Sequence, residues 1–138
     1  GFLVRDIDGG ITVFDYGYLG YFHIGFVPND GLALSLYSGS DYLVLSGIQL
    51  AFLSFIAYFA YEKKSTNIAW SLVMAGGISN VSERLFDGFV TDYIWLGLLG
   101  QPSPIFNLAD VSIFIGGLVI IYSLVINNTN NNNNKSET

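Results

Sequence analysis

The sequence predicts an all-α membrane helix bundle that carries a small extracytoplasmic β element. Hydrophobic residues make up 51% of the 138 residues and charged residues only 12%, a balance typical of membrane proteins. Three apolar runs, at about 42–61, 67–86 and 104–126, are long enough to cross the roughly 30 Å of hydrocarbon in a bilayer. Residues 1–41 are instead rich in glycine, aromatic and acidic residues, so we expect them to lie outside the membrane.

Within this first region, residues 11–26 favour a few short strands rather than a span. Short runs rich in Tyr, Phe, Val and Ile are interrupted there by three glycines. The stretch Pro28–Gly31 is a turn signal, and composition alone makes Asn29 a turn-forming residue.

A polar stripe runs along the outer half of the second apolar run. Asn80 is followed by Glu83 three residues later and by Arg84 four residues later, so the three side chains share one helix face. Such a face is prohibitively costly in lipid and must point into the bundle or a wet cavity. Gly76, one turn earlier, permits close approach of a neighbouring helix.

The third apolar run carries an ionisable residue near its start. Ser103-Pro104 matches a helix N-cap followed by proline at the first helical position, so we expect the helix to begin there. Asp110 then lies roughly 9 Å along the axis at ~1.5 Å per residue, on the same face as Asn107. A carboxylate inside a lipid-solvated helix indicates a functional site, although a tolerated Asp near the interface is the alternative.

Charge predicts the topology. Lys63 and Lys64 mark the loop between the first two spans as cytoplasmic, and Lys135 puts the Asn-rich, disordered tail 127–138 on the same side. The link 87–103 then lies outside, which brings Asp92 close to Asp110. Two such carboxylates could activate a water for peptide hydrolysis. An ion-pair network through Arg84 that only holds the spans together explains their spacing equally well.

Composition also excludes several function classes. A net charge of −6 argues against nucleic-acid binding, which needs a basic surface. The chain has no cysteine and one histidine, so we expect no metal site.

Four blocks in chain order resemble the signature blocks of signal peptidase II, the lipoprotein signal peptidase family. They are Asn29–Ser35 (NDGLALS), Gly76–Arg84 (GGISNVSER), Gly88–Tyr93 (GFVTDY) and Phe106–Asp110 (FNLAD). The resemblance implies a four-helix aspartic endopeptidase of the bacterial cytoplasmic membrane, with its active site toward the outer face. Such an enzyme cuts diacylglyceryl-modified prolipoproteins just before the lipidated cysteine, uses no cofactor, contacts membrane lipids and needs no second subunit.

The resemblance also assigns roles to individual positions of this sequence. Asp92 and Asp110 fall on the catalytic pair, which we expect to share a proton and clamp one water. Four polar residues fall on positions that line the substrate site: Asn29, Asn80, Arg84 and Asn107. Four further positions support the site: Gly31, Gly76, Glu83 and Ala109.

The sequence departs from the family pattern at several positions. Glu83 stands where the family usually has Asp, Ser79 replaces a usual Gly, and Leu32 replaces a smaller residue. The family's first helix has no counterpart here, so we expect the chain to be truncated, with three visible spans of four. A non-catalytic membrane scaffold on the same helices is therefore the alternative function. A proton carrier is disfavoured because the acidic residues gather at one face.

Overall fold

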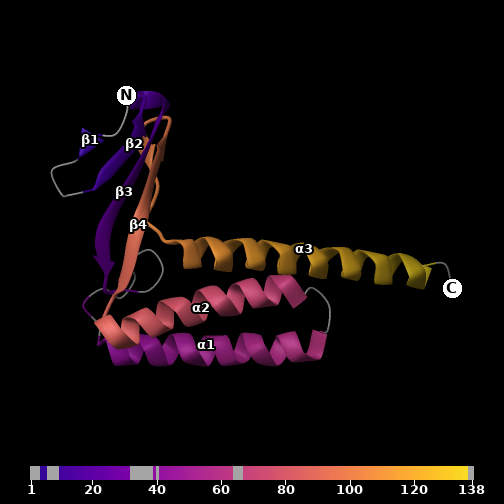
Figure 1. Cartoon of the computed structure of the whole chain (residues 1–138). Helices are drawn as coiled ribbons and strands as arrows, with labels where there is room; N and C mark the ends of the chain where they lie inside the picture. The colour runs from indigo at the N-terminus through magenta and orange to yellow at the C-terminus, as the bar shows by residue number, and fades with distance from the viewer. Residues whose placement is uncertain (1–3, 6–9, 32–38, 40, 64–66, 137–138) are drawn as a thin grey trace.

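The computed structural model describes residues 4–5, 10–31, 39, 41–63 and 67–136. An antiparallel sheet stands at one end of three long helices, where α2 ends and α3 begins (Figure 1). The elements, in chain order, are β1 Val4–Arg5, β2 Ile11–Asp15, the short 3-10 helix η1 Gly17–Leu19, β3 Gly20–Asn29, α1 Tyr42–Lys63, α2 Asn67–Asp87, β4 Val90–Leu98, β5 Gln101–Pro102 and α3 Leu108–Ser136.

The sheet has five antiparallel strands in the order β1-β2-β3-β4-β5. The small β element is therefore confirmed, with β2 and β3 in the region that the sequence assigns to strands. Strands β3 and β4 pair from Gly20↔Leu98 to Asn29↔Val90, although α1 and α2 separate them in the chain. This long ladder joins the N-terminal region to the segment that follows α2.

Strands β4 and β5 are absent from the sequence-based prediction, which treats residues 87–103 only as a link between two spans. The stretch Val90–Trp95 is rich in β-branched and aromatic residues, which is the signal for a strand. Leu99 (φ 52°) and Gly100 (φ 73°) both adopt left-handed conformations, as the two central residues of a type I′ hairpin do. They turn β4 back into β5, so the link is a hairpin.

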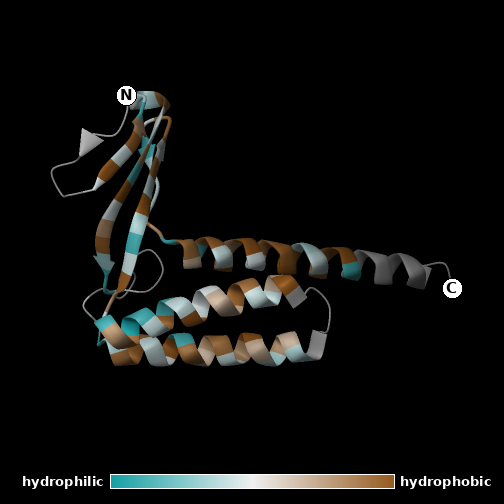
Figure 2. Ribbon diagram, viewed as in Figure 1, coloured by the Kyte–Doolittle hydropathy of each residue, from teal (hydrophilic) through white to brown (hydrophobic). Residues whose placement is uncertain are grey.

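Two of the three helices are long and apolar enough to cross a membrane, through Tyr42–Tyr61 of α1 and Leu108–Asn127 of α3. Most side chains of both stretches are exposed in the structure, as lipid-facing helices require. Helix α2 is of similar length but more polar, and its polar residues gather at the end beside the sheet (Figure 2). The described residues thus form three long helices and a five-stranded sheet, an α-plus-β fold rather than the predicted all-α bundle, and two of the three predicted spans meet this test.

Helix α3 differs from its prediction at both ends. It begins at Leu108 rather than at residue 104, because Phe106 pairs with Ile94 of β4 through backbone hydrogen bonds of 2.8 and 3.0 Å. The extended segment before Leu108 therefore belongs to the edge of the sheet. At the other end the helix continues through Ser136, where disorder is expected from the Asn-rich sequence. Each residue added to an existing helix gains one backbone hydrogen bond, which offsets the modest helix propensity of asparagine.

Glycines set the close packing of α2 against α3. A Cβ atom on Gly76 would lie 2.4 Å from the carbonyl oxygen of Ala109, and one on Gly116 would lie 2.6 Å from the carbonyl oxygen of Ala69. The two backbones therefore approach within a distance that only glycine permits at these points. This crossing holds the first turn of α3 against the polar half of α2.

We expect Gly76→Ala to destabilise the fold by about 1–3 kcal/mol, because the added methyl forces the helices apart. Gly117→Ala is the matched control, since a Cβ on Gly117 meets nothing within 4 Å. Thermal unfolding of both variants in detergent measures the difference. Equal melting temperatures would contradict the close approach of α2 and α3.

Candidate active site

The two aspartates that the sequence singles out come from different elements. Asp92 is the third residue of β4 and is only 5% exposed, and Asp110 lies half-buried in the first turn of α3. Both positions differ from expectation, since Asp92 lies in a strand rather than in a link between two spans. Asp110 lies at the helix start rather than roughly two turns inside the helix.

Asp110 is fixed by a reciprocal capping arrangement with Asn107. The side-chain Oδ1 of Asn107 accepts the backbone N–H of Asp110 at 2.9 Å, and Asp110 Oδ2 accepts the backbone N–H of Asn107 at 3.1 Å. This is the pattern of a capping box, in which the N-cap and N3 side chains satisfy each other's backbone donors. The helix start and the orientation of the Asp110 carboxylate are therefore determined together.

Two asparagine side chains connect the two carboxylates, and a third binds Asp92 alone. Asn107 Nδ2 donates to Asp92 Oδ1 at 3.0 Å and to Asn80 Oδ1 at 3.2 Å, and Asn80 Nδ2 donates to Asp110 Oδ1 at 2.9 Å. Asn29 Nδ2 donates to Asp92 Oδ2 at 2.9 Å. Each of the four carboxylate oxygens thus accepts a hydrogen bond from a neutral amide N–H. We call Asn29, Asn80, Asn107 and the two aspartates the dyad network.

Burial raises the pKa of Asp92 above the ordinary value of an aspartate, and the negative charge of Asp110 raises it further. The amide hydrogen bonds from Asn29 and Asn107 act in the opposite direction, because they stabilise the ionised form. Burial is the largest of these effects. Asp92 therefore binds a proton at a higher pH in the folded protein than in the unfolded chain.

This raised pKa predicts how stability changes with pH. Between the unfolded pKa of about 3.9 and the higher folded value, the folded state binds more protons, so the free energy of unfolding falls as pH rises. We expect the difference in melting temperature between wild type and Asp92→Asn to change across this window and to be constant above it. A difference that is independent of pH from 4 upward would show that Asp92 titrates normally.

Arg84, predicted to line the substrate site, and Glu83, predicted to support it, both hydrogen-bond segments next to the dyad network. Arg84 is 1% exposed and donates through Nη1 to Gln49 Oε1 at 2.6 Å and through Nη2 to the carbonyl oxygen of Gly31. Glu83 Oε1 accepts the backbone N–H of Thr91 at 2.9 Å, which holds the residue next to Asp92. Gln49 is absent from the sequence-based candidates, and a carboxamide in an otherwise apolar span is the signal that could have identified it.

Gly31 completes the turn that orients Asn29. The backbone N–H of Gly31 donates to Asn29 Oδ1 at 2.9 Å, which closes an Asx-type turn and directs Nδ2 of the same side chain to Asp92. The same turn therefore explains both the turn signal in the sequence and the polar position predicted for Asn29.

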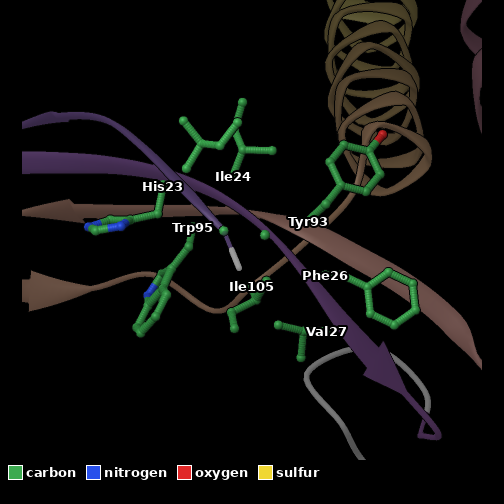
Figure 3. Close-up of a pocket in the computed structure, with 10 residues that line it drawn as sticks. His23, Ile24, Phe26, Val27, Tyr93, Trp95 and Ile105 are labelled. Carbon is green, nitrogen blue, oxygen red and sulfur yellow. The ribbon is translucent and has the colours of Figure 1, made fainter. Parts of the chain in front are cut away.

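An apolar groove on the sheet is separate from the dyad network. Figure 3 shows side chains of β3, β4 and the segment before α3 around it, among them His23, Val27, Trp95 and Ile105. Tyr93 and Trp95 alternate with Asp92 along β4 and therefore project from the opposite face of that strand. Within the described residues, no group of three or more His, Cys, Asp or Glu side chains is arranged to hold a metal ion.

An amide-bound carboxylate pair beside membrane-type helices is the arrangement expected of a membrane aspartic peptidase. The family model described as signal peptidase (SPase) II matches residues 3–126. The chain therefore belongs to the signal peptidase II family, which makes it an aspartic peptidase with a signal peptidase II function.

Curated relatives named lipoprotein signal peptidase agree with this family. The protein of Wigglesworthia glossinidia brevipalpis is 35% identical over 105 residues, which cover 72% of this chain and 69% of that protein. The protein of Chlamydia pneumoniae is also 35% identical, with 73% of this chain and 62% of that protein covered. The protein of Vibrio campbellii is 32% identical, with 86% and 80% covered. The chain thus spans 62–80% of the length of these relatives.

Solved structures share the fold. One, titled as a bacterial membrane enzyme structure at 2.3 Å resolution, superposes with a TM-score of 0.72 at 29% identity and covers 86% of this chain and 73% of that chain. A second bacterial membrane enzyme superposes with a TM-score of 0.65 at 30% identity, with 82% and 74% covered. The sheet and helices described above are therefore those of a known membrane enzyme.

Proposed function

We propose that this chain removes signal peptides from diacylglyceryl-modified prolipoproteins and cuts just before the lipidated cysteine. Asp92 and Asp110 are the catalytic pair in this proposal. The observation that carries it is the dyad network, in which every carboxylate oxygen accepts an amide N–H. Amide donors orient a carboxylate without adding a positive charge, so the pair still favours holding one shared proton.

Because the two carboxyl groups share one proton, one of them acts as the base and the other as the acid. The ionised carboxylate takes a proton from a water as the water oxygen bonds to the scissile carbonyl carbon. The protonated carboxyl polarises that carbonyl and then gives its proton to the leaving amine as the C–N bond breaks. The raised pKa of Asp92 favours it as the member that carries the proton before substrate binds. In a coupled carboxylate pair the roles of acid and base belong to the pair rather than to one residue.

The position of the dyad network favours a site at one membrane face. Helices α1 and α3 cross the bilayer in this proposal, and α2 crosses between them with its polar end beside the sheet. The end of α1 that carries Lys63 then lies on the cytoplasmic side, so the dyad network and the sheet face outward in a bacterial cytoplasmic membrane. The exposed apolar walls of the helices suit the lipid chains of a substrate, and one chain carries the whole dyad network without a second subunit.

The test is a cleavage assay with the gene product that contains this chain, reconstituted in liposomes. Purified prolipoprotein is supplied with and without diacylglyceryl modification of its cysteine. The proposal predicts cleavage of the modified form at a rate at least about tenfold higher than that of the unmodified form. Binding of both forms without cleavage would favour the scaffold alternative instead.

A further inference from the structure

Gln49 carries a carboxamide in the stretch of α1 that is otherwise long and apolar enough to cross a membrane. Its neighbours Ile48 and Leu50 are 52% and 47% exposed, whereas Gln49 itself is partly buried against α2. An amide in such an environment requires a hydrogen-bond partner. Gln49 Oε1 has one, because it accepts Nη1 of Arg84 at 2.6 Å.

Arg84 connects α1 to the sheet, because it also hydrogen-bonds a residue that follows β3. Its guanidinium is almost fully buried, and Nη2 donates to the carbonyl oxygen of Gly31 directly after β3. Its Nε–H has no hydrogen-bond partner in the part of the chain that the structure describes. The side chain is thus oriented mainly by Gln49 on one side and Gly31 on the other.

The link continues to the catalytic pair. Gly31 donates its N–H to Asn29 Oδ1, and Asn29 Nδ2 donates to Asp92 Oδ2, both at 2.9 Å. A continuous series of hydrogen bonds therefore runs from Gln49 through Arg84, Gly31 and Asn29 to Asp92. Every member is a described residue, and the series joins α1, α2, the turn after β3 and β4.

We infer that Gln49 is a positioning residue for Asp92, which acts through Arg84, the Gly31 turn and Asn29. This inference rests on the proposed peptidase function. Without the Gln49 acceptor, Arg84 loses one of its two anchors and no longer fixes the carbonyl of Gly31. The turn then holds Asn29 less firmly, so one oxygen of Asp92 loses its donor. Small displacements of a catalytic group are known to reduce turnover strongly.

The inference predicts a change in the pH profile as well as in rate. Among the described residues, Asp110 of α3 and Glu83 and Arg84 of α2 act on Asp92 by charge, and Asp30 after β3 also acts on Arg84. A weaker Asn29 hydrogen bond and a displaced Arg84 both disfavour the ionised form of Asp92. The profile of kcat against pH should therefore move to higher pH, a result that a purely structural role would not produce.

The experiment compares Gln49→Met, which keeps the length of the side chain but removes the acceptor, with Gln49→Glu, which keeps an acceptor oxygen. Gln49→Met should lower kcat about tenfold with KM changed less than about twofold, and Gln49→Glu should restore most of the loss. Ser54→Ala is the control on the same helix, because among the described residues Ser54 Oγ donates only to the Leu50 carbonyl oxygen, one turn earlier. It should match wild type.

A double-mutant cycle tests whether Gln49 acts on Asp92 through this series of hydrogen bonds. In an Asn29→Ala background, Gln49→Met should change kcat by less than about twofold, because the series is already interrupted. Additive losses, an unshifted pH profile, or full activity of Gln49→Met would each overturn the inference. Failure of wild type to cleave would instead overturn the proposed function, so the two failures are distinguishable.

Discussion

Asp92→Asn and Asp110→Asn should each lower kcat by about a thousandfold or more, with KM nearly unchanged. Either change removes a group that must hold or accept a proton while leaving a side chain of the same shape. The four amide contacts to the pair show that both carboxylates are held in one site. Single-turnover cleavage of a diacylglyceryl-modified prolipoprotein gives the rate directly.

The double variant supplies a further check on the pair. Residues that act as a unit lose activity non-additively, so Asp92→Asn combined with Asp110→Asn should be no slower than the slower single variant. Asp15→Asn is the matched control, since Asp15 is an exposed carboxylate whose Oδ1 accepts the Gly17 N–H at a turn of the sheet. Substantial turnover by either single variant would remove that aspartate from the mechanism.

Asn107→Leu should lower kcat about a hundredfold and destabilise the fold by about 1 kcal/mol. Asn107 is 3% exposed and makes four contacts: it caps α3, closes the capping box with Asp110, and donates to both Asp92 and Asn80. Its loss therefore removes a donor from the dyad and a cap from the helix. The two effects are measured separately, by turnover and by thermal unfolding.

Asn107→Ser separates these two roles. Serine retains an oxygen that can cap the helix but has no group that reaches Asp92, so stability should return while turnover stays low. Recovery of activity with recovery of stability would show that Asn107 acts only as a helix cap. Low activity in a stable Asn107→Ser variant is the result expected of a residue that orients Asp92.

How much of this site follows from the sequence depends on how far apart its parts lie in the chain. The polar stripe from Asn80 to Arg84 follows from helix spacing, because local periodicity determines it. The Asn29–Asp92 contact joins residues 63 positions apart and depends on the pairing of β3 with β4. The resemblance to the family indicated only that Asn29 lines the site, since register between distant strands is not encoded in local pattern.

The start of α3 is a second feature that the local sequence does not determine. Local cap propensity predicts a start at Ser103-Pro104, whereas the structure caps the helix with the Asn107–Asp110 pair. The backbone bridge between Phe106 and Ile94 decides between them, and it exists only once β4 has formed. The contact of Gln49 with Arg84 is similar, because it depends on how α1 rotates against α2.

Mass spectrometry of the cleavage products tests the central claim most directly. Diacylglyceryl-modified prolipoprotein is incubated with the gene product that contains this chain, with Asp92→Asn and with Asp15→Asn. The account predicts one new N-terminus, at the lipidated cysteine, for wild type and Asp15→Asn only. Cleavage at another bond, or the same product from Asp92→Asn, would contradict it.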